Sequence, residues 1–211
     1  MLQGCAESET TGEYQMPIRR RIRMAIPKPD IRPVDELIAV RRQQHGGSRG
    51  APKKTAGGQR VGAALNKSCI LMMSALLQGY VEDVFLAASQ RLFKTLADEA
   101  AQKRYAETLR ATGNPSSENI ARLFLRIGKV DVFDGLSWQK ASMKQIKEKL
   151  RDINELRNKI AHGKALPEAV SLTKVETLRN FVDQFGSRFA RSYRRILVTD
   201  GVRRQRLELA M

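Results

Sequence analysis

The sequence feature that most constrains the fold is the spacing of apolar side chains from Gly62 onward. They recur three and four residues apart, which places them on one face of an α-helix, whereas a half-buried strand would alternate every second residue. We find no strand-like alternation and no internal repeat. The first long helix is expected to be buried on several sides and to run to about Phe93 or Leu96. Its apolar stripe comprises Leu65, Cys69, Met72, Met73, Leu76, Tyr80 and Val84.

Turn and capping residues divide the rest of the chain into further helices. Gly113-Asn114-Pro115 is expected to stop one of them, and Asp200-Gly201 is expected to end the last. That last helix is expected to begin near Ser171 or Thr173, and Thr173 with Glu176 three residues later fits a capping box. After the first helix, the expected helices lie at about 100–109, 117–128, 143–160 and 173–199. The fold class predicted is all-α, an antiparallel bundle of about four or five helices.

Residues 1–61 differ from this pattern and are expected to form an irregular, basic N-terminal arm. They contain the cluster Arg19-Arg20-Arg21-Ile22-Arg23 and several prolines, which interrupt long helices. A short helix from Asp35 to Gln44 is expected, because acidic residues suit a first turn. The basic cluster either contacts nucleic acid or is a solvated leader. The predicted organisation is an arm at 1–61, a helical bundle at 62–200 and a C-terminal tail at 201–211.

The formal net charge is +16 over 211 residues. Such a charge favours a polyanionic partner, nucleic acid or an anionic membrane surface, although it can also serve solubility. The two cysteines form no C-x-x-C pair, so no disulfide framework is indicated and a reducing compartment is expected. No apolar stretch reaches the roughly 18 residues that span a bilayer, and the N-terminus lacks the order of a secretory signal. We therefore expect a cytoplasmic protein without a membrane partner.

One short segment concentrates reactive side chains: Arg157-Asn158 followed by His162, at the end of a predicted helix. Residues four apart share a helix face, so Asn158 and His162 lie together, whereas Arg157 is about 140° around the helix from His162. The long arginine side chain can still reach the same solvent edge. Histidine exchanges a proton near neutral pH, and arginine matches phosphate oxygens and offsets developing charge. RNA carries its own nucleophile, the ribose 2′-hydroxyl, so this trio suits cleavage of RNA without a metal.

A simpler interpretation is that His162 and Gly163 only cap the helix. Cationic residues near a helix C-terminus are favoured by the helix dipole, and glycine commonly follows the last helical turn. The spacing alone leaves the cap and the active site open. The chain has one other histidine, His45, which we interpret as an exposed linker residue. No cluster of Asp, Glu and His has the spacing of metal ligands, so no cofactor and no metal are expected.

The segment Arg157-Asn158-Lys159-Ile160-Ala161-His162-Gly163 resembles the Arg-Asn/Asp-x(3–5)-His motif of the HEPN superfamily. Leu65-Asn66-Lys67-Ser68 followed by Gly79-Tyr80-Val81-Glu82-Asp83 is similar to the first long helix of the RiboL-PSP-HEPN type. Ser117-Glu118-Asn119-Ile120 and Leu136-Ser137-Trp138 resemble the middle section of that type, and Val170-Ser171-Leu172-Thr173 fits the start of its last helix. The resemblance covers roughly residues 62–195 and leaves the arm unaccounted for.

The resemblance implies a helical bundle that dimerises, so that two such motifs face a shared cleft. It further implies a metal-independent endoribonuclease, often part of a toxin–antitoxin or anti-phage system. Carried over by position, His162 is the acid or base, Arg157 the phosphate or transition-state group, and Asn158 the orienting residue. Lys159 and Lys164, beside the motif, are candidate RNA contacts. The expected partners are RNA, a second copy of the chain and an antitoxin protein.

The chain departs from related sequences in its first long helix. They often carry an aromatic-acidic pair where this chain has Leu77-Gln78, so Glu82 and Asp83 are the candidates for acidic support. A solvated helix face explains both residues at least as well. The alternative function is a non-catalytic RNA- or nucleotide-binding or interaction module in which His162 is structural. A sequence-specific DNA-binding regulator is disfavoured, because no helix-turn-helix pattern is present.

Overall fold

The computed structural model describes residues 28–45, 52–92, 113–128, 132–139, 141–166 and 168–208. Within these ranges no strand is found, and two isolated bridges, Lys54–Arg60 and Trp138–Ala141, are the nearest approach to one. The all-α prediction is confirmed. The helix expected at about 100–109 lies outside the described residues. The described helices are α1 (Arg32–His45), α2 (Ala63–Leu92), α4 (Ser117–Gly128), α5 (Met143–Ala161) and α6 (Leu172–Glu208).

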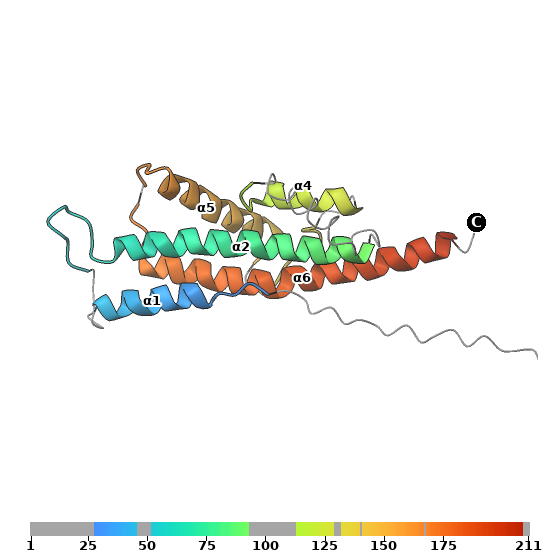
Figure 1. The fold of residues 1–211 in the computed structure, drawn as a ribbon, viewed down its shortest axis with the longest axis horizontal. Coiled ribbons are helices and arrows are strands. Elements are labelled where there is room, and N and C mark those ends of the chain that lie inside the picture. The colour runs from blue at the N-terminus through green and yellow to red at the C-terminus, as the bar shows by residue number, and fades with distance from the viewer. Residues whose placement is uncertain are drawn as a thin grey trace, which may run out of the picture.

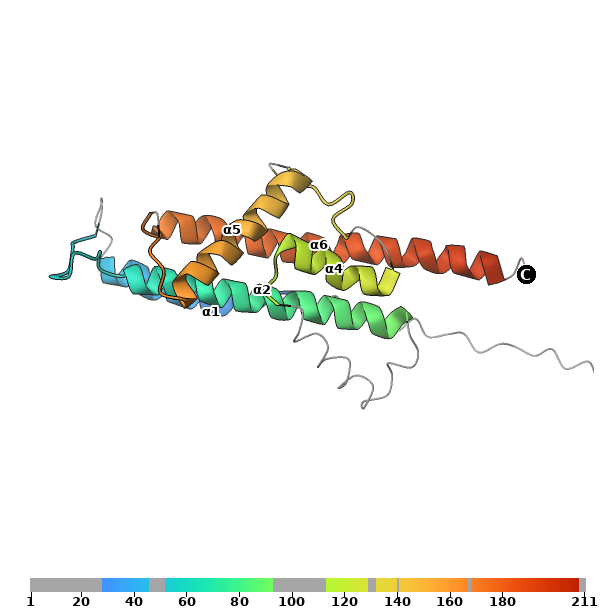
Figure 2. The same ribbon diagram turned by 90° about the horizontal axis from the view of Figure 1, so that it is seen from above.

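Helices α2 and α6 lie at the centre of the bundle and run in the same direction (Figure 1). Helices α4 and α5 lie on one side of this pair and α1 on the other, and α5 crosses the pair at a steep angle (Figure 2). Helix α1 is antiparallel to α2, and α5 runs obliquely across α6, with its end toward the start of α6. Helix α2 contacts every other described helix, which is why its sequence is apolar on more than one face.

Aromatic rings from α2, α4, α6 and the loop before α5 form the centre of the core. Phe189 of α6 is fully buried, and its ring lies 4.8 Å from that of Phe185 and 5.4 Å from that of Phe124, between centroids. Tyr80 of α2 donates a hydrogen bond of 2.6 Å from its hydroxyl to the carbonyl oxygen of Gly186. This buried bond links the two central helices, and burial raises the pKa of the Tyr80 phenol.

The predicted apolar stripe of α2 is buried or partly buried, with one exception. Met72 was expected in the core, but 38 % of it is exposed, as is 36 % of its neighbour Leu71. Both lie on a helix face that neither α1, α4, α5 nor α6 covers. Cys69 is buried, as expected for a small core residue, and its burial raises the pKa of the thiol.

Helix α2 also corrects the expectation that no segment is apolar enough to cross a membrane. Residues Ala63–Ser89 are long and apolar enough to do so, by length and composition only. Half of the most apolar part of this segment is buried inside the bundle. The central helix of a bundle meets the same criterion, because a helix surrounded by other helices needs little polar surface.

Helix α1 confirms the short helix expected from Asp35 to Gln44, and it begins three residues earlier, at Arg32. The earlier start is possible because Pro33 falls in the first turn, where no intrahelical N–H bond is lost. Ile31, Val34 and Ile38 are buried in the core cluster. The division into arm, bundle and tail stays a prediction, but these contacts attach this part of the arm to the bundle.

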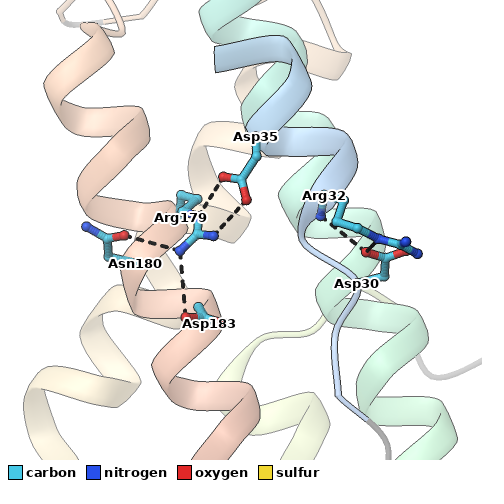
Figure 3. Close-up of polar contacts among 6 residues, drawn as sticks. All are labelled: Asp30, Arg32, Asp35, Arg179, Asn180 and Asp183. Atoms are coloured by element: carbon cyan, nitrogen blue, oxygen red, sulfur yellow. Dashed lines mark hydrogen bonds and ion pairs between the residues drawn. The ribbon is translucent and has the colours of Figure 1, made fainter. Parts of the chain in front are cut away.

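Ion pairs join α1 to α6 (Figure 3). The guanidinium of Arg179 donates two hydrogen bonds to the Asp35 carboxylate, at 2.8 and 2.7 Å, and lies 3.6 Å from Asp183. One turn nearer the start of α6, Glu176 accepts a hydrogen bond of 2.7 Å from Arg42. The bidentate geometry fixes the register of the two helices more than it adds stability, because these side chains remain partly exposed.

Of the two expected starts of α6, the structure has the one at Ser171, whose hydroxyl accepts a hydrogen bond of 3.1 Å from the backbone N–H of Lys174. The capping box at Thr173 is not the cap. The expected end at Asp200-Gly201 is wrong, because the helix ends at Glu208. A glycine inside a helix costs only about 1 kcal/mol relative to alanine, and the following residues, rich in arginine and leucine, are good helix formers.

Candidate functional site

Helix α5 carries the candidate motif, and its start is firmly fixed. Ser142 and Gln145 form a reciprocal capping box, in which each side chain accepts a hydrogen bond from the backbone N–H of the other residue. Ile146, Leu150 and Ile153 are buried at the spacing that the sequence predicts. This packed face leaves the last turn of α5, with Arg157 and Asn158, at the rim of the bundle.

A Schellman motif ends α5. The backbone N–H of Gly163 donates to the Ile160 carbonyl at 3.2 Å, and that of Lys164 donates to the Lys159 carbonyl at 2.8 Å. Gly163 has φ 63°, a left-handed conformation that favours glycine. His162 is the C-cap, and its backbone N–H donates to Asn158 at 3.1 Å. The backbone at His162 is therefore fixed, whereas its side chain is exposed.

Asn158 joins the motif to another part of the fold. Its Oδ1 accepts a hydrogen bond of 3.0 Å from Arg157 Nη1 and one of 2.9 Å from Asn114 Nδ2. The orientation of the Asn158 amide follows from chemistry, because a guanidinium can only donate and must face the oxygen. These two bonds use both lone pairs of Oδ1. Asn158 Oδ1 therefore links the guanidinium of Arg157 to the side-chain amide of Asn114.

Asn114 bonds to Asn158 in turn. From the sequence, Asn114 was expected only to help stop a helix. It lies in the loop before α4, where its backbone carbonyl accepts bonds of 2.8 Å from both Asn119 Nδ2 and the Ser116 N–H. The Ser116 hydroxyl caps α4 by accepting from the Asn119 N–H at 3.2 Å. Asn114 is thus fixed by α4 and presents its amide to α5. Asn114 is 44 positions from Asn158, so no local sequence motif could predict this contact.

Several donors of the motif remain unused. Among the described residues, the Asn158 amide nitrogen, the remaining guanidinium N–H groups of Arg157 and the imidazole of His162 have no hydrogen-bond partner. The structure brings Arg157 and Asn158 together by a side-chain contact, but it does not join either to the imidazole. The arrangement offers donors for an anion on one side and a proton-exchanging group nearby at the helix end.

Glu82 and Asp83 lie differently with respect to this site. Glu82 accepts a hydrogen bond of 3.0 Å from Gln78, and both line a small hollow of about 10 Å³ that Asn114 also lines. Asp83 is exposed, makes no contact with the hollow, and has its carboxyl pKa raised by partial burial. Glu82 therefore lies beside the network that holds Asn158, and Asp83 does not.

Lys159 and Lys164 flank the motif. Lys159 is partly buried in the last turn of α5, and Lys164 is exposed just beyond the Schellman motif. In the part of the chain that the structure describes, no three His, Cys, Asp or Glu side chains lie close enough together to hold a metal ion.

The family model of RiboL-PSP-HEPN matches residues 48–194, which is more than half of the chain. The chain belongs to the HEPN superfamily. No curated protein and no solved structure matches it. The match to this HEPN type supports a nuclease-like or RNA-related module. It includes α2, α4, α5 and most of α6, so the end of α5 and its contact with Asn114 both lie inside the HEPN region.

Proposed function

We propose that this HEPN protein is a metal-independent endoribonuclease that works as a homodimer. The observation that carries the proposal is the network at the end of α5, where Asn114 and Arg157 both donate to Asn158 Oδ1. This network holds a permanently charged arginine near the end of α5, the helix that ends at the exposed His162. A fixed cation lowers the cost of charge developing on a phosphate, because little reorganisation is needed at the moment of reaction.

The proposed reaction uses the RNA's own 2′-hydroxyl. The 2′-oxygen attacks phosphorus while a base takes its proton, and the bond between phosphorus and the 5′-oxygen breaks while an acid protonates the leaving oxygen. The products are a 2′,3′-cyclic phosphate and a 5′-hydroxyl. His162 exchanges the proton, Arg157 binds the non-bridging oxygens, and Asn158 orients Arg157. Lys159 and Lys164 attract the flanking phosphates.

Cleavage of RNA in the presence of EDTA tests this proposal. Purified protein is expected to cut a single-stranded RNA and to leave 2′,3′-cyclic phosphate and 5′-hydroxyl ends. The matched control is the same oligonucleotide with 2′-deoxyribose at the mapped cut site, which should stay intact because it lacks the nucleophile. Cleavage that needs a divalent metal, or that continues at the deoxyribose, would contradict the proposal.

The homodimer is supported by the exposed apolar residues of α2. Leu71 and Met72 are exposed beside Ser68 and Ala75, on a helix that also contacts α5. We expect sedimentation equilibrium to give twice the mass of one chain and Leu71→Glu to give a monomer. Leu125→Glu on α4 is the matched control, because Leu125 is 49 % exposed and should leave the mass unchanged. A wild-type monomer would contradict the dimer.

Asn114 is expected to act as a positioning residue for cleavage. Asn114→Ala should lower kcat by about 10- to 100-fold with a small change in KM, because the arginine loses its fixed orientation. Asn114→Asp keeps the shape but cannot donate. It would turn the Asn158 amide nitrogen toward itself and draw the Arg157 guanidinium to its own carboxylate, so the arginine changes its orientation and a similar loss is expected.

The control for these variants is Asn154→Ala, one turn earlier on α5, which should keep wild-type kcat. Thermal unfolding of each variant separates the two possible roles of Asn114. A role in stability alone would lower the melting temperature and leave kcat unchanged in the folded protein.

The second candidate function is a binding module without catalysis, and the Schellman motif favours it. That motif explains Gly163 and the backbone of His162 by helix capping alone. RNA binding that weakens steeply with salt, with no cleavage product, would support this function.

The biological setting that we propose is cytoplasmic toxin–antitoxin or anti-phage defence, with an antitoxin protein as partner, as the family resemblance implies. Expression of the wild type in cells should then be toxic, and expression of His162→Ala should not be.

A further inference from the structure

We propose that the start of α2 is a second anion site, which takes a phosphoryl group and uses none of the residues of the motif on α5. The proposal rests on a buried arginine without a partner among the described residues, on free backbone donors and on an open hollow lined by the first turn of α2.

The buried arginine is Arg41 of α1. Only 4 % of it is exposed, and its Nε and Nη1 are fully enclosed without a hydrogen-bond partner among the described residues. A guanidinium stays charged in proteins, so an enclosed one is costly unless an acceptor meets it. Its neighbour Arg42 lies at the surface and donates to Glu176. Arg41 has no such carboxylate, and an anionic ligand would supply the missing acceptor.

The guanidinium of Arg41 is directed at the beginning of α2. It lies against Gly62, where the first atoms that a Cβ would meet are Arg41 Nε, Cδ and Cζ. Gly62 also has φ 78°, which an L side chain rarely adopts. Glycine at this position therefore allows the cation to reach the backbone of the helix start.

The first turn of α2 contains backbone N–H groups that can donate hydrogen bonds to a ligand. Gly62 precedes the helix and has no side-chain oxygen to cap it, and the first turn contains no acidic residue. The N–H of Ala63 bonds to Arg60 at 3.0 Å, and that of Asn66 bonds to Gly62 at 3.2 Å. The N–H groups of Ala64 and Leu65 between them have no acceptor in the described part of the chain. Free N–H groups at the positive end of a long helix favour an anion.

A surface hollow of about 330 Å³ opens at this position. Its walls are the first turn of α2, Gln44 of α1, and Thr55, Gln59 and Arg60 of the preceding loop, so they contain no carboxylate. Lys53 and Lys54 are exposed on the same loop. The helix end and the side chains of Gln44 and Gln59 line this hollow, and the Arg41 side chain lies against Gly62, which also lines it. Several oxygens on one small anion, as in a phosphoryl group, match such a set better than a single-point anion does.

Two sources of this chemistry are possible, a backbone phosphodiester of a nucleic acid or a phosphate monoester. The start of α2 lies at the same end of the bundle as the end of α5 (Figures 1 and 2), so one polynucleotide could reach both. The experiment therefore has one arm for each source. Neither arm measures RNA cleavage, so its result is independent of the proposed nuclease activity.

The first arm measures thermal unfolding in sodium phosphate and in sodium chloride at equal pH and ionic strength. Phosphate is expected to raise the melting temperature of the wild type and of Arg42→Met, and not that of Arg41→Met. Both variants lose one positive charge from α1, so a general charge effect would change them equally. In chloride, Arg41→Met should be at least as stable as the wild type, because it removes an uncompensated buried charge.

A measurement on the unmodified protein supports this arm if the variant does not fold. In an NMR titration with inorganic phosphate, the amide signals of Ala64 and Leu65 should shift and saturate. Signals that move uniformly without saturation, or only elsewhere, would overturn the site.

The second arm measures binding of a single-stranded 2′-deoxy oligonucleotide as a function of salt. If the ligand is a phosphodiester, Arg41→Met should reduce the slope of log K against log salt by about 0.7, the value for one lost phosphate contact. If the ligand is a monoester, the slope should stay unchanged while the phosphate-dependent stabilisation disappears. Either result supports the site and identifies its source.

Equal behaviour of Arg41→Met and Arg42→Met in both arms would overturn the proposal. So would a wild type that gains nothing from phosphate over chloride. That result would fit a buried water, and not an anion, as the partner of Arg41.

Discussion

RNA cleavage by the His162→Ala variant is expected to fall by about 10²- to 10⁴-fold, the usual contribution of a positioned acid or base. In the proposed reaction His162 is the acid or base, whereas the guanidinium of Arg157 binds the phosphate and the amide of Asn158 orients that guanidinium. The loss should appear in kcat, since Arg157 and the lysines still bind the phosphates. Single-turnover cleavage of a labelled RNA measures it.

The fold should tolerate this substitution. The His162 side chain is exposed and has no hydrogen bond among the described residues, and the Schellman bonds at this helix end are made by the backbone. An exposed side chain without partners usually changes the free energy of unfolding by no more than about 0.5 kcal/mol. Far-ultraviolet circular dichroism and a urea titration should therefore match the wild type.

The matched control is His45→Ala, which replaces the other histidine of the chain in the same way and should keep full activity. A His162→Ala variant that cuts RNA at the wild-type rate would place the chemistry elsewhere. If the wild type and both variants bind RNA and none of them cleaves it, the binding module is favoured.

Phe189→Ala is expected to lower the free energy of unfolding by about 3–5 kcal/mol, the usual cost of replacing a buried phenylalanine. Phe189 is fully buried, and its ring meets those of Tyr80, Phe124, Phe133 and Phe185. These neighbours come from α2, α4, α6 and the loop before α5, so the cavity would loosen most of the described core at once. The loss is a large share of the roughly 5–15 kcal/mol of a typical domain.

Urea unfolding followed by circular dichroism measures this loss. Leu125→Ala is the matched control, because its side chain lies on the outer face of α4 and should change the free energy of unfolding by no more than about 0.5 kcal/mol. A loss below about 1 kcal/mol for Phe189→Ala would contradict the packing described for the core.

Much of the fold could be predicted because its signals are local. The spacing of Ile146, Leu150 and Ile153 predicted α5, and the helix expected at about 117–128 has the bounds of α4. Ser171 and Thr173 are both good caps, so the sequence left the start of α6 open between them. The local pattern could not show that Glu176 is held by Arg42, more than a hundred positions away.

The candidate site likewise has residues that the sequence could identify and a residue that it could not. Arg157, Asn158 and His162 could be identified because they follow one another on a single helix. Asn114 could not, because it lies in a loop 44 positions from the residue that it holds. Met72 was expected in the core because the spacing of apolar residues identifies the apolar face of a helix. That spacing does not show which part of the face a neighbouring helix covers. These are the features that only packing decides.

The position of α1 determines where a shorter fragment of this protein should begin. The region shared with the family begins at residue 48, after α1 has ended at His45. Yet Val34 and Ile38 are buried in the common core, and Asp35 and Arg42 are tied to α6. A fragment trimmed to the family boundary would expose the apolar surfaces of α2 and α6 beneath α1, and would become prone to aggregation. The region that the family model matches is therefore shorter than the region that packs into one core. A fragment meant to fold should begin no later than about residue 28.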